Sequence, residues 1–179
     1  MVKEPKRSKS ESLSMRLDPR SRFVLAFVAR MEARSITTIV ERAIQQYADR
    51  VVVGPEWDDR GNKVGERTWA DYWDPSEGVR TLKMLADRDV PTTFEDDELR
   101  AFVVAHQPFF YQDRDCQQPQ RVFVEILWPE IERFLEVWRT QKATDYWAAG
   151  EQMKARLLAA KVKPPEWPPA VEPDDDIPF

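Results

Sequence analysis

The chain has 179 residues, of which 42% are hydrophobic and 33% charged, which allows one sizeable domain or two small ones with a true core. Its longest apolar run, residues 23–29, is far too short for a transmembrane helix, and residues 1–10 are polar and basic, without the apolar stretch of a secretory signal. One Cys and one His exclude a disulfide framework and almost every metal site, so we expect no metal and no cofactor. We also expect no membrane contact, and a bacterial cytoplasmic location fits best.

The net charge of −5 is divided unevenly along the sequence. Residues 1–50 contain 11 Lys and Arg against 6 Asp and Glu, a net charge of +5, whereas residues 51–179 contain 16 against 26, a net charge of −10. The basic part is expected to attract phosphates, and the acidic part to face away from nucleic acid or to contact another protein. Residues 1–10 lack any apolar period and are predicted to be a flexible basic arm.

Residues 12–17 alternate between apolar side chains (Leu13, Met15, Leu17) and polar ones (Ser12, Ser14, Arg16). A period of two predicts a strand with one buried and one polar face. Asp18 and Pro19 then open a helix, and a second helix is expected to end near Tyr47. Because the strand has no partner within this segment, a second copy of the chain is the simplest partner. The first helix is apolar almost all round, which favours an interwoven dimer over a surface hairpin.

Residues 12–48, about a fifth of the chain, resemble the ribbon-helix-helix DNA-binding domain of Arc, MetJ and CopG-like repressors. In that family two chains pair their strands into an antiparallel ribbon that lies in the major groove. The resemblance implies that Leu13, Met15 and Leu17 face the dimer core, and that Ser12, Ser14 and Arg16 face the base edges. It also implies that Ser35 caps the second helix and that Thr37, Thr38 and the helix N-terminus hold a phosphate.

One feature departs from the family pattern. The turn between the helices often carries Gly in the family, whereas here it is Ala33-Arg34. A generic helical hairpin that starts a larger core is the alternative to the DNA-binding domain. If the domain does bind DNA, the arm beside it would add backbone contacts through Lys6, Arg7 and Lys9.

The DNA-binding domain is thus expected over residues 11–50, and the composition of the sequence changes after it. Residues 51–68 are rich in turn-forming Gly, Pro, Asp and Asn, which predicts a linker or a small hairpin around Gly61. Residues 69–162 are predicted to form a helical domain of unknown role, with helices opened by Asp74-Pro75, Thr93 and Thr144. From Phe123 to Trp138 the helical spacing crosses Pro129, which predicts a kink or a fresh start, although residues 122–128 also fit a buried strand.

The helical region gives no indication of an enzyme. His106 is a lone histidine with no nucleophile or carboxylate constellation around it, so a structural role is favoured. The acidic run 95–98 is typical of a solvated first turn of a helix. The Trp and Phe residues mostly fall on helical stripes, which favours core packing over base stacking.

Residues 163–179 combine a Pro-rich stretch with an acidic end. Five Pro between residues 164 and 173 exclude a helix and predict an extended spacer. The end, Asp174, Asp175, Asp176, Ile177, Pro178 and Phe179, resembles the C-terminal tip of bacterial single-stranded-DNA-binding protein, which docks onto replication and repair proteins. The ring and α-carboxylate of Phe179 would fit an apolar pocket with a basic lip, and the Asp residues would steer the tip there. An ordinary acidic tail is the alternative.

The predicted fold is mainly α: a ribbon-helix-helix that forms an intertwined dimer, a helical C-terminal domain and a Pro-rich acidic tail. The leading hypothesis is a sequence-specific duplex-DNA-binding homodimer, associated with the nucleoid or a plasmid. It would recruit proteins that bind the single-stranded-DNA-binding protein tip, as an accessory factor in replication, partition or transfer of a mobile element. Two alternatives are an autoregulatory transcriptional repressor or antitoxin, and a decoy for those tip-binding proteins.

Overall fold

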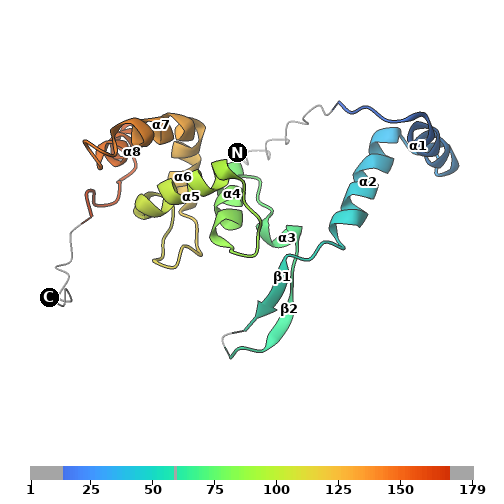
Figure 1. The fold of residues 1–179 in the computed structure, drawn as a ribbon, viewed down its shortest axis with the longest axis horizontal. Helices are drawn as coiled ribbons and strands as arrows, with labels where there is room; N and C mark the ends of the chain where they lie inside the picture. The colour runs from blue at the N-terminus through green and yellow to red at the C-terminus, as the bar shows by residue number, and fades with distance from the viewer. Residues whose placement is uncertain (1–13, 59, 170–179) are drawn as a thin grey trace, which may run out of the picture. The chain divides into compact units, whose positions relative to one another are not determined.

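The computed structural model describes residues 14–58 and 60–169 and divides the chain into two compact units, Met1–Val51 and Val52–Phe179. Both units are built mainly of helices, as the sequence predicts (Figure 1). The division falls at the start of the predicted boundary region 51–68, whose remaining residues belong to the second unit. Within the described part of the chain, no helix combines the length and apolar character needed to cross a membrane.

The described part of the first unit, residues 14–51, contains two helices, α1 (Pro19–Met31) and α2 (Ile36–Ala48). Asp18 caps α1 as predicted, since its carboxylate accepts hydrogen bonds from the backbone N–H of Arg20 at 2.9 Å and of Ser21 at 3.1 Å. Pro19 occupies the first helical position, where a missing N–H costs nothing. Helix α1 therefore begins where it was predicted to begin, and α2 ends at Ala48, close to its predicted end near Tyr47.

The turn between these helices closes α1 with a Schellman motif. Ala33 has a positive φ of 50°, and its N–H donates to the carbonyl of Arg30 at 3.2 Å. The N–H of Arg34 donates to the carbonyl of Ala29 at 2.9 Å. This hydrogen-bond pattern normally places glycine at the left-handed position. The alanine in this turn therefore follows the path that glycine would take, at some cost in strain.

Residues 51–68 form the small hairpin rather than a plain linker. Strand β1 (Gly54–Trp57) pairs antiparallel with β2 (Lys63–Arg67). Asp58 holds the turn, because its carboxylate accepts the N–H of Asn62 at 2.8 Å, and Gly61 supplies the positive φ of 76°.

The base of this hairpin is fixed by an ion-pair cluster. Arg67 pairs with Asp87 at 2.6 Å and also with Asp89. The hydroxyl of Tyr72 donates to the same Asp87 carboxylate at 2.5 Å. These contacts join β2 to the residues just after α4.

The rest of the second unit is a helical body, as predicted. Its elements in chain order are α3 (Trp69–Tyr72), α4 (Glu77–Ala86), α5 (Phe94–Ala105), η1 (Gln107–Phe109), α6 (Arg121–Leu127), η2 (Trp128–Glu130), α7 (Ile131–Gln141) and α8 (Ala148–Ala159). Thr93 caps α5 as predicted, in a reciprocal capping box with Asp96. Residues 122–128 are helical, so the strand alternative is wrong. At Pro129 a short 3₁₀ turn separates α6 from α7, which corresponds to the predicted fresh start.

Two predicted helix starts are displaced. Helix α4 begins at Glu77, because the Asp74 carboxylate accepts the N–H of Ser76 at 2.8 Å and pairs with Arg121 instead of capping a helix at Pro75. Helix α8 begins at Ala148 rather than after Thr144, because residues 142–147 are mostly in turns. Asp-Pro and Thr alone do not distinguish a cap from a preceding turn, since the same side chains satisfy both.

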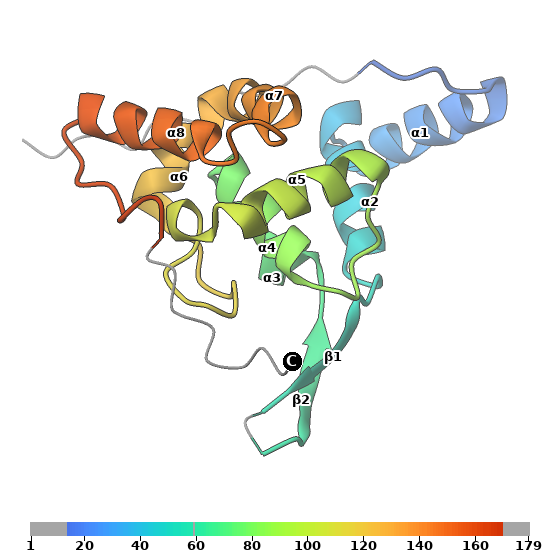
Figure 2. The ribbon, with the colours of Figure 1, turned by 60° about the vertical axis from the view of Figure 1, so that its left-hand side comes forward.

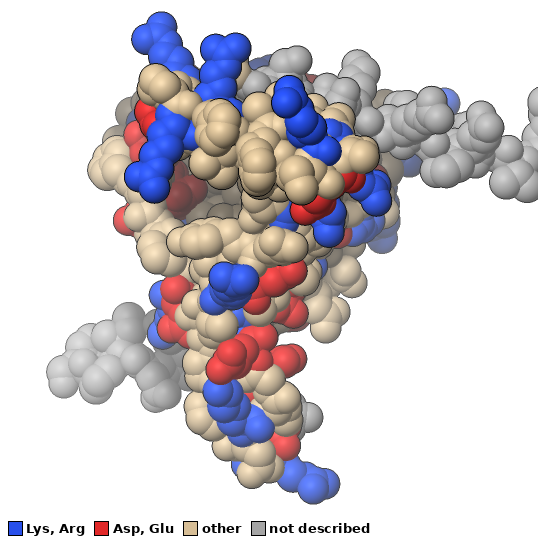
Figure 3. Space-filling model, turned by 90° about the vertical axis from the view of Figure 1, so that its right-hand side faces the viewer, with Lys and Arg blue, Asp and Glu red and all other residues tan. Residues whose placement is uncertain are grey.

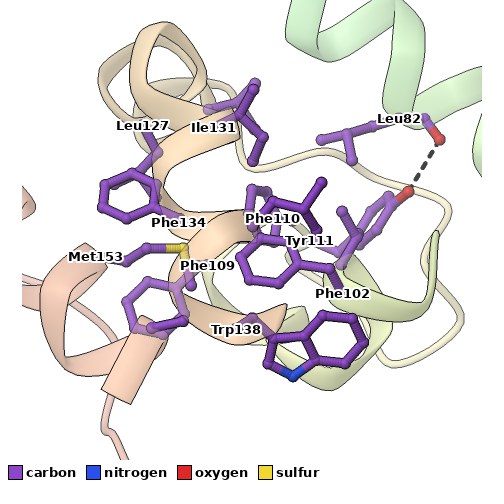
Figure 4. Close-up of a cluster of buried hydrophobic side chains, with 14 of the residues drawn as sticks. Leu82, Phe102, Phe109, Phe110, Tyr111, Leu127, Ile131, Phe134, Trp138 and Met153 are labelled. Atoms are coloured by element: carbon purple, nitrogen blue, oxygen red, sulfur yellow. Dashed lines mark hydrogen bonds between the residues drawn. The ribbon is translucent and has the colours of Figure 1, made fainter. Parts of the chain in front are cut away.

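The core of the second unit is largely aromatic. Side chains from α4 to α8 point into one cluster (Figure 4), whose labelled members include Leu82, Phe102, Phe109, Phe110, Leu127, Phe134 and Met153. All of these are buried, and the hydroxyl of Tyr111 donates to the carbonyl of Leu82 at 2.9 Å inside the cluster. Most of the Phe residues described in this unit therefore lie in the core, as predicted, although Phe94, Trp57 and Trp73 lie on the surface.

The prediction of a free spacer from Lys163 is wrong for residues 163–169. The segment is not helical, as its prolines require, but after α8 it turns back and packs on the body (Figure 2). Its anchor is Trp167, which is buried in the aromatic core. Burying an indole of about 150–250 Å² is worth roughly 4–6 kcal/mol, which outweighs the preference of a Pro-rich stretch for solvent.

Candidate nucleic-acid interface

The N-terminus of α2 is the best-defined part of the predicted interface. Ser35 caps the helix as predicted, because its hydroxyl oxygen accepts the N–H of Thr38 at 3.1 Å. The hydroxyls of Ser35 and Thr38 are also hydrogen-bonded to each other at 2.9 Å. The cap leaves the first amides of α2 directed out of the helix end, where an anion is stabilised by the helix dipole. Ser35 and Thr37 are exposed and Thr38 is half-buried.

Sequence reasoning treated Arg34 only as part of the turn and missed its position beside this cap. The residue is exposed and directly precedes Ser35, and no ion pair of its own occurs among the described residues. A guanidinium next to a capped helix N-terminus adds charge-assisted donors to the backbone amides. The order Arg34-Ser35 could have indicated this position, since any basic residue just before an N-cap lies beside the helix end.

Only part of the predicted base-reading strand is described. Ser14 and Arg16 are exposed, as are Met15 and Leu17 on the predicted dimer face. Ser12 and Leu13 lie outside the described residues, and so do Lys6, Arg7 and Lys9 of the basic arm. Residues 14–18 form no strand in the single chain. A strand exists only in a ladder with a partner, so its pairing with a second copy stays a prediction.

The first unit leaves much of its apolar surface uncovered. On α1, Phe23 is 68% exposed, Phe27 53% and Met31 69%, with the two Phe rings stacked at a centroid distance of 6.2 Å. On α2, Ile44 and Tyr47 are exposed as well. So many exposed large apolar side chains in so small a unit are typical of a protein interface.

An open groove of about 790 Å³ lies between the two helices. Apolar side chains of both helices line it, among them Val24 and Val28 of α1 and Ile39 and Ala43 of α2. In the view from this side, Lys, Arg, Asp and Glu side chains are scattered over largely uncharged surface, and the projecting hairpin also carries both charges (Figure 3). The helix pair thus combines exposed apolar side chains with cationic ones, and Arg20 and Arg42 line the groove itself.

Most candidate residues of the helical body have structural partners. His106 is fully buried in the aromatic core, where burial lowers the pKa of its imidazole. In the acidic run, Asp96 completes the Thr93 capping box and Glu98 accepts two hydrogen bonds from Arg139, which lower the pKa of Glu98. Among residues 14–58 and 60–169, no group of three or more acidic, His or Cys side chains is arranged to hold a metal.

The predicted docking tip, residues 174–179, lies outside the described residues. Comparisons with protein-family models, with curated proteins and with solved structures give no match to this chain.

Proposed function

We propose that the first unit binds duplex DNA as a homodimer. One observation carries the proposal: a two-helix unit with an uncovered apolar surface presents a capped helix N-terminus with Arg34, Thr37 and Thr38 at its lip. A second copy covers the apolar surface, and pairing of residues 12–17 from the two copies forms a ribbon. In the ribbon Ser12, Ser14 and Arg16 face base edges, while the α2 N-terminus holds a phosphate.

The dimer is tested with two matched substitutions on α2. Ile44→Asp places a charge on the exposed apolar surface, whereas Gln45→Asp places the same charge on a neighbouring exposed polar position. Sedimentation velocity should show loss of the dimer and of duplex binding for Ile44→Asp only. A wild-type chain that is monomeric at tens of micromolar, with or without duplex, would refute the homodimer.

The DNA site is tested by selection from a random duplex library with the full chain. Enrichment of an inverted repeat is expected, because a two-fold protein reads two equivalent half-sites. A library that shows no enriched sequence would argue against base readout. The genomic position of the enriched site then separates the roles: an origin of replication or transfer supports an accessory factor, and the promoter of its own gene supports a repressor.

The second part of the proposal is recruitment of a protein through Asp174–Phe179, and its support is the sequence of that segment. Phe179→Ala should abolish binding to a protein that recognises the tip of single-stranded-DNA-binding protein, because the ring is the apolar anchor. Duplex binding by the same variant should be unchanged. Undiminished binding of Phe179→Ala to such a receptor would refute the recruitment.

A further inference from the structure

The Pro-rich segment 163–169 is held in the second unit by a pocket shaped for one indole ring. Trp167 is only 4% exposed. Its ring stacks on His106 and meets Phe109 and Trp147 edge to face, with all three centroid distances at 5.2 Å. Gly150 of α8 also lies against the ring, and a Cβ there would overlap the indole. The absence of a side chain at Gly150 is therefore what admits a ring of this size.

Hydrogen bonds fix the direction of the segment in its site. The indole N–H of Trp167 donates to the carbonyl of Trp147 at 3.3 Å, and the ammonium of Lys154 donates to the carbonyl of Trp167 at 2.9 Å. Pro164 and Pro165 are half-buried in a shallow groove on the same body. An aromatic anchor, a proline flank with few conformations to lose and a contact to the peptide backbone are the parts of a peptide-recognition site.

The connection between α8 and this segment is strained. Lys161 has a positive φ of 61°, which L residues with a side chain adopt at a cost. The N–H groups of Lys161 and Val162 donate to Leu158 at 2.9 Å and to Leu157 at 3.0 Å, so the chain reverses within a single turn. An extended hinge would remove the backbone strain at Lys161. Short, strained hinges favour domain swapping, in which the segment that follows the hinge docks on another copy of the chain.

We propose that the Trp167 pocket is an exchangeable docking site, and that its second occupant is the 163–169 segment of another copy of this chain. Every copy carries both the pocket and the ligand, so exchange preserves each contact and changes only the hinge at Lys161. Within one chain the short tether gives an effective concentration on the order of millimolar, so the closed form predominates in dilute solution. When the local concentration of the chain is high, the 163–169 segment of one copy occupies the pocket of another and so links their second units. The site belongs to the second unit and is independent of DNA binding by the first.

A labelled peptide of residues 163–169 tests the site in the full chain. The Trp167→Ala chain should bind this peptide, and the wild-type chain should bind it at least about 100-fold more weakly, because its own segment competes. A peptide with Ala in place of Trp should bind neither chain. A Trp167→Ala chain that is folded by circular dichroism and yet takes up no peptide would overturn the proposal.

Two hinge variants keep Trp167 in place and test exchange directly. Lys161→Gly relieves the left-handed residue, whereas Lys161→Val disfavours it. Isotopically heavy and light copies are mixed at high concentration, and cross-links between Lys154 and Lys163 are sorted by mass. The share of links between copies should rise several-fold for Lys161→Val and fall below the wild-type share for Lys161→Gly. Equal shares in the three proteins would overturn the exchange.

Discussion

The imidazole ring of His106 lies against the indole ring of Trp167, with the ring planes inclined by 24°. Nδ1 of His106 donates to the carbonyl of Phe102 at 2.9 Å, since a carbonyl can only accept. Nε2 is buried and has no hydrogen-bond partner among the described residues. Burial lowers the pKa of His106, and the bond to Phe102 offsets this only in part. An imidazolium at this position would bury a proton without an acceptor.

This contact predicts a loss of stability in mild acid. In the unfolded chain His106 titrates near 6.5, and in the folded chain it titrates lower, so the unfolded state binds its proton first as the pH falls. The free energy of unfolding that comes from the neutral, buried His106 is fully present above about pH 6.5. It is lost as the pH falls from there through the lower pKa of the folded state. Urea unfolding between pH 7.5 and pH 5 should show a steeper decline for the wild type than for His106→Gln, which cannot titrate. Parallel declines would contradict the prediction.

The left-handed turn at Ala33 predicts a stabilising substitution. Ala33→Gly should raise the free energy of unfolding of the first unit by about 1 kcal/mol, because glycine adopts a positive φ without steric cost. Ala26→Gly, at an exposed position inside α1, is the matched control and should lower it by about 1 kcal/mol. Thermal unfolding by circular dichroism at one protein concentration measures both. A destabilising effect of both variants would show that the turn carries no strain.

The features predictable from sequence are those decided by neighbouring residues. Asp18-Pro19, Ser35 and Thr93 mark helix starts correctly, because an N-cap satisfies amides only two or three positions away. Neighbouring residues predict a helix start wrongly where a contact with a residue far away in the sequence determines it. Asp74 follows the same Asp-Pro pattern as Asp18, but it lies against Arg121, 47 residues further along, and the helix starts later.

Trp167 shows the same limit for tertiary packing. Its proline neighbours predict an extended chain, and the segment is indeed not helical. Nothing local indicates the pocket, because its walls come from residues 106, 109, 147 and 150, which only the fold brings together. In the candidate interface the capping role of Ser35 is predictable, because it depends on neighbouring residues. The proposed ribbon would depend on contacts with a second chain.

The predicted base contact of Arg16 leads to a sequence-dependent effect. Arg16→Ala should weaken binding to the selected duplex by about 1–3 kcal/mol and relax the preference at one base pair in each half-site. Arg50→Ala, which removes the same charge from an exposed position after the C-terminal end of α2, is the control. Mobility-shift titrations with the selected duplex and single-base variants measure both. Equal losses for the two variants would show that Arg16 contributes charge alone.

The position of Arg34 beside the Ser35 cap leads to a different expectation. A phosphate contact carries no sequence information, so Arg34→Ala should weaken binding to all duplexes by a similar factor. It should also reduce the slope of log K against log salt concentration by about 1 for each copy of the chain, because one fewer phosphate is neutralised. Titrations between 50 and 250 mM salt measure this slope. Ser35→Ala tests the same helix end without removing a charge, so it should cost about 1 kcal/mol of stability and leave the slope nearly unchanged. A slope that is unaltered in Arg34→Ala would place the phosphate away from the α2 N-terminus.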